Sequence, residues 1–175
     1  MNAREDVVAA VVEVAGGRLT GRVRLQKTVY LLDQLGLNSG FSYEYYHYGP
    51  YASDLDNAMA DARAFGLIEE DFGHRVSDGA MYSIFQLKSP PKQEVFADQL
   101  NRERAKKLVG LFARTNITVL ELAATIDWLW RKEGSDDWRR EITRRKGVKV
   151  QGGRLDKAVE LLNKIGLAPP QAAAA

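Results

Sequence analysis

The chain contains no cysteine, and only two of its 175 residues are histidine. Without cysteine the protein has no disulfide bond, no thiolate nucleophile and no zinc site built on sulfur ligands. The two histidines, His47 and His74, lie far apart in the sequence, so they do not indicate a dedicated transition-metal site. We therefore predict that the protein has no metal site and uses no cofactor.

Long hydrophobic runs are missing as well. No apolar run approaches the roughly 18 residues of a transmembrane helix, and the N-terminal stretch carries acidic residues that a signal peptide lacks. We expect a cytoplasmic protein. A glycine-rich phosphate loop and a Ser–His pairing are also absent from the sequence, so we predict that the protein is not an enzyme.

Acidic and basic residues are distributed unevenly along the chain. Residues 1–90 contain 8 Lys and Arg against 12 Asp and Glu, whereas residues 91–175 contain 17 against 11. The change falls at Pro90 and Pro91, which disfavour helix as a linker does. We predict an N-terminal part over residues 1–90, a helical part over residues 91–167 and a flexible tail over residues 168–175.

Hydrophobic periodicity in the first part predicts three helices, a tyrosine-rich strand and a hairpin. The helices are expected over residues 4–15, after a cap at Thr20, and from a capping box at Ser53 and Asp56 to Gly66. The strand is expected over residues 41–48, and the hairpin strands over residues 67–71 and 80–87. This order of elements is typical of a winged helix.

The second part has the pattern of an all-helical region. We expect a long helix from Glu94 to Arg114 and a buried helix that begins at a capping box of Thr118 and Glu121. Two further helices are expected over residues 136–146 and 155–165. The predicted fold class is α+β and mostly α, with a winged-helix-like N-terminal part that holds a three-stranded small sheet or a hairpin, and a C-terminal helical part.

Two motifs give the chain a resemblance to a known family. The segments "RVRLQKTVYLLDQLG" and "YHYGPYASDL" resemble the bacterial and phage Panacea proteins, and the pattern of the whole chain is similar to the related YwgA-like proteins. The resemblance covers residues 18–70 well and residues 118–167 loosely. It implies a small helical protein that binds another protein, chiefly as the antitoxin of a toxin–antitoxin system, and it implies no catalytic residue.

Five of the seven tyrosines lie between Tyr43 and Tyr51. Alternation along a strand places Tyr43 and Tyr45 on one face and Tyr46 on the other, so Tyr46 and Tyr48 are exposed if the first two are buried. Tyrosine is favoured in protein-binding hot spots, although these rings also suit ordinary packing. The predicted partner-binding patch is Tyr46, His47, Tyr48, Gly49, Pro50 and Tyr51.

Two groups of basic residues are candidates for binding an anion or a nucleic acid. They are Arg18, Arg22, Arg24 and Lys27 in the first part, and Arg144, Arg145, Lys146 and Lys149 in the second. Phosphate attraction dominates DNA affinity, and these residues supply it. The alternatives are a solvated basic face for the first group and, for the second, neutralisation of the acidic first part.

The function that we predict from the sequence is non-catalytic protein binding. The protein would act as an antitoxin-like or adaptor-like module on a partner protein, with nucleic acid as a second and less favoured partner. The alternative is a winged-helix transcriptional regulator. The predicted third helix carries Asp54, Asp56 and Asp61, and these carboxylates oppose DNA binding through that helix.

Overall fold

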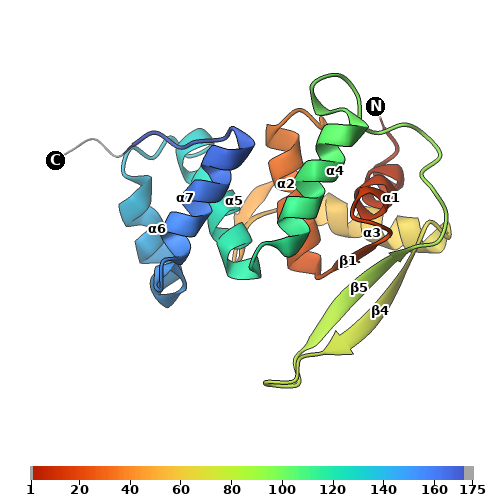
Figure 1. The fold of residues 1–175 in the computed structure, drawn as a ribbon, viewed down its shortest axis with the longest axis horizontal. Coiled ribbons are helices and arrows are strands. Elements are labelled where there is room, and N and C mark those ends of the chain that lie inside the picture. Colours follow the sequence, from red (N-terminus) through yellow and green to blue (C-terminus); the bar gives the residue numbers. More distant parts are fainter. Residues whose placement is uncertain (1, 172–175) are drawn as a thin grey trace.

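The computed structural model describes residues 2–171 and confirms a mostly helical α+β fold (Figure 1). The helices are α1 (Arg4–Val14), α2 (Arg22–Gln34), α3 (Ser53–Ala64), α4 (Arg102–Arg114), α5 (Ile117–Arg131), α6 (Trp138–Lys146) and α7 (Arg154–Ile165). The strands are β1 (Arg18–Thr20), β2 (Glu44–Tyr46), β3 (Gly49–Tyr51), β4 (Ile68–His74) and β5 (Met81–Leu87). Two short 3-10 helices, η1 (Asp98–Leu100) and η2 (Gly147–Val150), complete the fold.

The larger sheet is antiparallel with the strand order β1-β5-β4. Strand β1 was not predicted, because a strand of three residues is too short to show a period of two. Its Leu19 pairs with Phe85 of β5, and both side chains are buried. The pairing of β1 with β5 therefore attaches the predicted hairpin to the rest of the fold.

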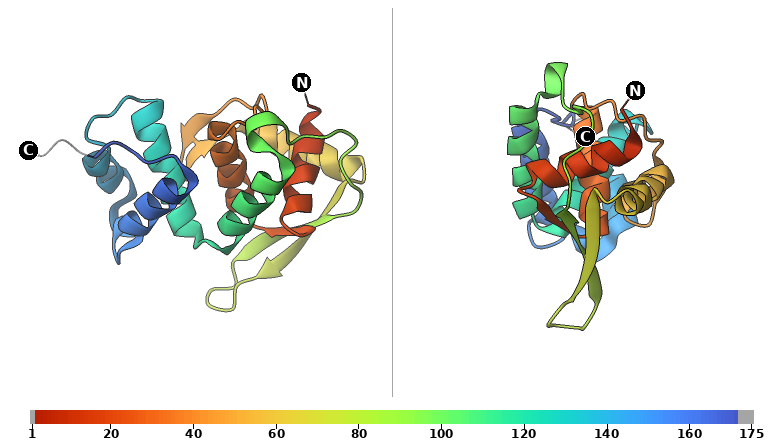
Figure 2. Two further views of the ribbon diagram at one scale, coloured as in Figure 1. Left: turned by 45° about the horizontal axis from the view of Figure 1, so that its top comes forward. Right: turned by 90° about the vertical axis from the view of Figure 1, so that its right-hand side faces the viewer.

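The β4–β5 hairpin extends away from the body of the protein (Figures 1 and 2). Ile68 at one end of β4 is buried, but Phe72 and Met81 farther along the hairpin are exposed. The predicted strand over residues 67–71 is longer in the structure and reaches His74. Cross-strand pairing with β5 extends it, although the outer half buries little apolar surface.

A single hydrophobic core runs through both halves of the chain. Helix α4 packs against α1 and α2, and α5 packs against α2, α7, α6 and β3. The prolines Pro90 and Pro91 lie in the connection to α4 and do not separate two independent cores. Within residues 2–171, no helix is both long enough and apolar enough to cross a membrane.

One predicted helix start and two predicted caps are wrong. The helix expected from Glu94 begins at Arg102, because the side chain of Asn101 accepts a hydrogen bond from the Arg104 amide and caps it there. Helix α5 is capped by Asn116 and not by Thr118. Ser53 makes no capping hydrogen bond at the start of α3. Capping depends on side-chain orientation, which spacing alone does not reveal.

The first residues of the predicted tail contact the helical part. Leu167, the residue before the predicted tail, is buried, and within the tail the carbonyl oxygen of Pro170 accepts a hydrogen bond from the indole nitrogen of Trp138 at 2.9 Å. These contacts hold the chain against α6 beyond the end of α7. Residues 172–175 of the predicted tail lie outside the described residues.

Candidate functional site

The two motifs that carry the family resemblance contact each other. Gln26 on α2 faces Ala52, which joins β3 to α3, and Lys27 faces Pro50 within β3. The Gln26 side chain accepts a hydrogen bond from the Ala52 amide at 3.0 Å and donates one to the Ala52 carbonyl oxygen at 2.9 Å. The Lys27 ammonium group donates to the carbonyl oxygen of Pro50 at 2.6 Å. Helix α2 therefore fixes the backbone of the tyrosine-rich segment.

The tyrosine-rich segment forms a hairpin and not the single strand that was predicted. Strands β2 and β3 pair antiparallel around a turn at His47 and Tyr48, with Tyr46 opposite Gly49. Gly49 has a φ of 88° and lies against Thr125 of α5, where it leaves no room for a side chain. The turn is thus held close to α5.

The exposure of the tyrosines follows the predicted alternation. Tyr43 is partly buried, and its hydroxyl donates a hydrogen bond to Asp33 at 2.6 Å. Tyr46 and Tyr48 are 56% and 51% exposed. Aromatic rings held rigidly at a surface can stack on a partner at a small cost in side-chain entropy.

Of the predicted partner-binding patch, Gly49 and Pro50 are buried. They support the hairpin from within, so the surface that this patch offers comes from its side chains at positions 46, 47, 48 and 51.

A pocket of about 210 Å³ opens beside these rings, and we call it the tyrosine pocket. It is lined by Arg22, Val23, Gln26, Lys27, Tyr46, Tyr48, Tyr51 and Asp56. The Tyr51 hydroxyl donates a hydrogen bond to Asp56 at 2.6 Å, and this bond, with some burial, raises the pKa of Tyr51 to about 12. Tyr51 therefore stays protonated at neutral pH, with Asp56 as its acceptor.

A second pocket of about 420 Å³ shares Tyr46 as a wall. We call it the arginine pocket; it is lined by Tyr45, Tyr46, His47 and Arg145. The Arg145 guanidinium lies over the Tyr45 ring, 4.6 Å from its centre. The Tyr46 ring is edge-on to His47 at 4.5 Å and tilted towards Tyr51 at 5.5 Å. One exposed ring thus separates two adjoining pockets.

Glu121 on α5 accepts hydrogen bonds from two lysines beneath the hairpin. It accepts from Lys146 at 2.9 Å and from Lys149 at 3.0 and 3.1 Å. The side chains of Glu121 and Lys146 are 5% and 3% exposed. Lys146 also donates to the carbonyl oxygen of His47, so this buried ion pair supports the turn of the hairpin. The sequence pattern predicted Glu121 only as a capping residue of α5.

Most of the predicted anion-binding residues have partners within the protein. Arg22 pairs with Glu70 at 2.8 Å, Arg24 donates to the carbonyl oxygens of Phe112 and Thr115, and Lys27 is buried. Arg18 is exposed, and no described residue forms an ion pair with it.

The second predicted basic group is neutralised within its own half of the chain. Arg144 pairs with Glu141, Arg145 pairs with Glu133 and Glu141, and Lys146 and Lys149 pair with Glu121. Neutralisation of the acidic first part by this group was the wrong interpretation. The helices that carry these charges pack on one another, which brings their own acids closer than those of residues 1–90.

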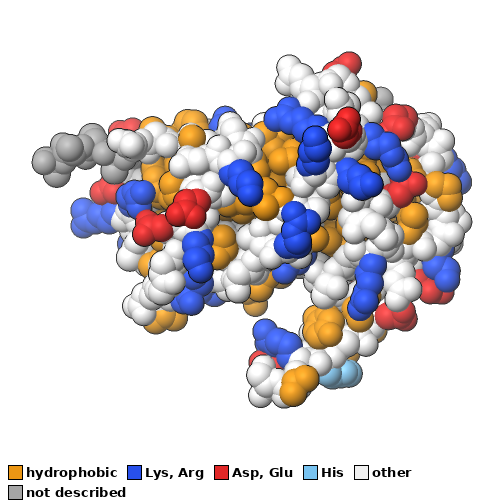
Figure 3. Space-filling view, in the orientation of Figure 1, with side chains coloured by type: hydrophobic (Ala, Val, Ile, Leu, Met, Phe, Trp, Pro, Cys, Tyr) orange, Lys and Arg blue, Asp and Glu red, His pale blue; other side chains and the backbone are white. Residues whose placement is uncertain are grey.

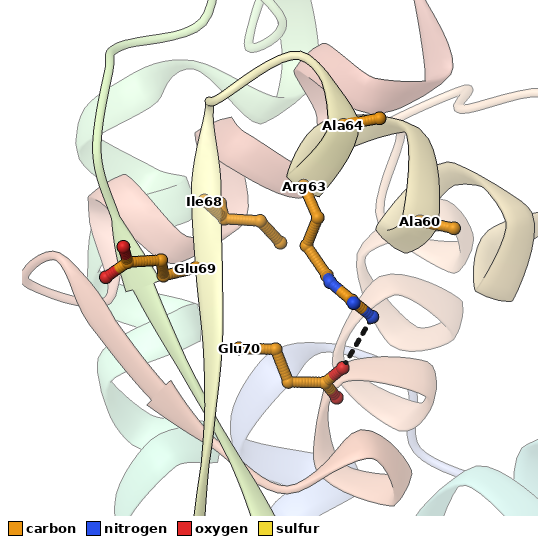
Figure 4. Close-up of a pocket in the computed structure, with 6 residues that line it drawn as sticks. All are labelled: Ala60, Arg63, Ala64, Ile68, Glu69 and Glu70. Atoms are coloured by element: carbon orange, nitrogen blue, oxygen red, sulfur yellow. Dashed lines mark hydrogen bonds and ion pairs between the residues drawn. The ribbon is translucent and has the colours of Figure 1, made fainter.

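A third pocket, of about 470 Å³, lies where α3 is followed by β4 (Figure 4). Arg63 and Glu70 face each other across it at 3.0 Å, whereas Glu69 points to the other side of β4. Glu70 also accepts hydrogen bonds from Arg22, so both charges that face this pocket are already paired. Because no aromatic ring of a described residue lines it, it is a weaker candidate than the tyrosine pocket.

Lys27 is expected to make the free energy of unfolding of the protein depend on pH. The pKa of Lys27 is lowered from 10.5 to about 7, chiefly by burial; Lys146 and Lys149 add to the lowering, and Glu121 opposes it. Between these two pKa values the unfolded chain binds a proton that the folded protein does not bind. Stability is therefore expected to fall as the pH falls from about 10.5 to about 7, and to level off below that.

The Lys27→Met variant lacks this titration and tests the prediction. Relative to the wild type, its free energy of unfolding should rise steadily as the pH falls from 10.5 to about 7. Urea unfolding across this range measures the difference. Lys88→Met, at a half-exposed side chain, is the matched control and should show no such trend. A difference between Lys27→Met and the wild type that does not change with pH would contradict the prediction.

Comparison with known proteins adds information about function. No protein-family model matches the chain. The chain is 31% identical over 127 residues to a DNA ADP-ribosyl glycohydrolase of Thermus aquaticus. The match covers 70% of this chain and 34% of the relative, so the chain spans about a third of the length of the curated relative that it matches.

This similarity corrects the function that was predicted from the sequence. A relative named as a DNA ADP-ribosyl glycohydrolase points to enzymatic work on modified DNA. It does not fit a non-catalytic antitoxin or adaptor, a transcriptional regulator, or the prediction that the protein is not an enzyme. The resemblance to Panacea and YwgA-like proteins is not tested by this comparison and stays a prediction.

Proposed function

We propose that this chain works in the enzymatic removal of ADP-ribose from DNA, and that the tyrosine pocket receives the ADP-ribosylated nucleotide. The observation that carries the proposal is the cluster of tyrosine rings beside the Asp56 carboxylate and the Arg22 guanidinium. The name of the relative supports the substrate class. The order of helices and hairpin, which we predicted from the sequence to be that of a winged helix, would suit a role on DNA.

The pocket has features that suit a nucleotide. Tyr46 and Tyr48 offer exposed rings, and stacking of a base on an aromatic ring tolerates every base because each has a π face. Arg22 lies 3.8 Å from Asp56 and 2.8 Å from Glu70, so its position is fixed before a ligand arrives. The tyrosine pocket and the arginine pocket together fall in the range of about 300–1,000 Å³ typical of ligand sites.

Asp56 is the residue that we assign to the hydrolytic step. Hydrolysis of a glycosidic bond passes through a transition state with positive charge on the sugar, which a nearby carboxylate stabilises. The oxygen of water forms the new bond to the anomeric carbon while the bond to DNA breaks, and the proton of water passes to the leaving DNA atom. Hydrogen bonds from Tyr51 and Gln26 hold the Asp56 carboxylate in place.

Binding is tested with the Tyr46→Ala variant. We expect it to bind an ADP-ribosylated oligonucleotide about 5- to 150-fold more weakly than the wild type, because it loses one stacking surface. Tyr46→Phe should bind nearly as well as the wild type, since the ring is kept. Phe72→Ala removes an equally exposed ring from the β4–β5 hairpin and is the matched control. Fluorescence anisotropy measures each affinity, and equal losses for Tyr46→Ala and Phe72→Ala would refute the site.

Hydrolysis is tested separately by chromatography of released ADP-ribose. Release by the wild type and its loss in Asp56→Asn, with binding retained, would support the assignment of Asp56. Binding without release would overturn that assignment and place the hydrolytic residues outside this chain.

A further inference from the structure

Two grooves lie on either side of the C-terminal end of α4. One, of about 370 Å³, is lined by Arg18, Leu19, Thr20, Arg24 and Ala113. The other, of about 350 Å³, is lined by Thr115, Asn116, Val119, Lys157, Glu160, Leu161 and Lys164. Arg114 lies between Ala113 and Thr115 and is exposed. The two grooves therefore meet at the end of one helix.

Positive charge predominates around these grooves. Arg18, Arg114, Lys157 and Lys164 are exposed, and none of the four forms an ion pair with a residue that the structure describes. We call these four residues the basic face. Glu160 is the one acidic residue among the described residues that line either groove. Figure 3 shows that Lys and Arg side chains predominate across the middle of this side of the molecule.

The floor of the first groove is rigid. One nitrogen of the Arg24 guanidinium donates hydrogen bonds to the carbonyl oxygens of Phe112 and Thr115 at 2.6 and 2.7 Å. These carbonyl groups lie at the C-terminal end of α4, where the partial negative charge of a helix favours a cation. Arg24 thus joins α2 to α4 and holds the basic face together, while the four exposed cations remain available to a partner.

Residues in the first turn of α2 line both the first groove and the tyrosine pocket. Arg22 and Val23 line the tyrosine pocket, and the next residue, Arg24, lines the first groove.

We propose that the basic face binds the phosphate backbone of duplex DNA and so presents the DNA to the tyrosine pocket. This inference rests on the proposed function, because the choice of DNA over another polyanion comes from the substrate of the proposed reaction. Lys and Arg contacts to phosphates carry no sequence information, but they position a protein on the duplex. The face then serves any DNA sequence that carries the modification.

The test is the salt dependence of binding to an unmodified duplex. With four phosphate contacts, the plot of log affinity against log salt should have a slope of about −3.6, so a fourfold rise in salt weakens wild-type binding roughly 150-fold. The variant with glutamine at all four positions, Arg18→Gln, Arg114→Gln, Lys157→Gln and Lys164→Gln, should lose most of this slope. Fluorescence anisotropy of a labelled duplex measures both.

A control variant changes the same number of charges elsewhere. It carries glutamine at Arg75, Lys88, Lys92 and Lys132, which are exposed and lie outside the basic face. We expect it to keep the wild-type slope. No binding of the duplex by the wild type, or equal slopes in the two quadruple variants, would overturn the proposal. Competition by polyglutamate as strong as by DNA would make the face a surface for acidic protein, which also overturns it.

The tyrosine-pocket variant separates this proposal from the proposed function. Tyr46→Ala should keep the salt slope on unmodified duplex, since it removes no cation. If the slope depends on the basic face but Tyr46 has no effect on modified DNA, then the proposed function fails and the basic face stands. If instead Tyr46→Ala weakens binding of modified DNA but the salt slope does not depend on the basic face, then the proposal for the basic face fails and the proposed function stands.

Discussion

Replacing Glu121 with glutamine is expected to lower the free energy of unfolding by about 3–5 kcal/mol. The carboxylate of Glu121 is almost fully buried and accepts from Lys146, whose side chain is 3% exposed. Without that negative charge the Lys146 ammonium group is left in the interior with no counter-ion, and a buried unpaired charge is costly. The turn at His47 weakens as well, because Lys146 donates to its carbonyl oxygen. For a chain of this size the midpoint of thermal unfolding should fall by roughly 6–20 °C.

Two variants show whether burial of the pair is the cause. Glu103→Gln makes the same chemical change at a pair with Lys107 whose side chains are 81% and 78% exposed, and it should cost less than about 1 kcal/mol. Glu121→Gln combined with Lys146→Met removes both buried charges and should recover most of the lost stability. The interpretation is wrong if Glu121→Gln costs no more than Glu103→Gln in chemical unfolding.

Replacing Gly49 with alanine is expected to destabilise the protein by about 2–5 kcal/mol. Two effects add up. Gly49 has a φ of 88°, a backbone conformation that alanine rarely adopts, and its added methyl group would overlap the hydroxyl of Thr125 on α5. The hairpin can avoid the overlap only by moving away from α5, which lengthens the hydrogen bonds from Lys27 and Lys146 to its backbone.

Gly66→Ala isolates the backbone effect. Gly66 has a φ of 72°, but an added methyl group would meet nothing within 4 Å, so this variant should lose only about 1–2 kcal/mol. The second change Thr125→Ala should restore part of the stability of Gly49→Ala, because it removes the atom that overlaps. If the two glycine variants lose equal stability in urea unfolding, close packing of the hairpin on α5 is not the reason for glycine at position 49.

The helices were the most predictable part of the fold. The apolar pattern of α5 predicted its burial, and Gly166 marked the end of α7, because both features are local properties of the chain. The exposure of Tyr46 also followed from a local rule, the alternation of side chains along a strand, whereas Tyr48 is exposed because it lies in the turn of the hairpin. Helix starts were less predictable, as Asn101 and Asn116 show, since a cap depends on how a side chain turns back on the backbone.

The site itself depended on contacts that no local pattern contains. Gln26 holds Ala52, Lys27 holds Pro50, and Glu121 holds Lys146, and each pair lies more than twenty positions apart in the sequence. Lys27 and Arg24 are both basic and close together in the sequence, so we predicted from the sequence that they belong to one anion-binding group. The packing of α2 buried Lys27 and directed Arg24 to the end of α4.

By itself the sequence determined the mostly helical class, the burial of α5 and the presence of an exposed aromatic segment. These features depend on the spacing of apolar residues and on the alternation of side chains, which act over a few neighbouring residues. Only the tertiary structure decided which charges stay free. Charged groups interact with the groups that the packed helices bring within a few ångströms. Ion pairs therefore neutralise most of the basic residues that we predicted from the sequence to bind an anion. Four exposed cations form no ion pair with a described residue: Arg18, Arg114, Lys157 and Lys164.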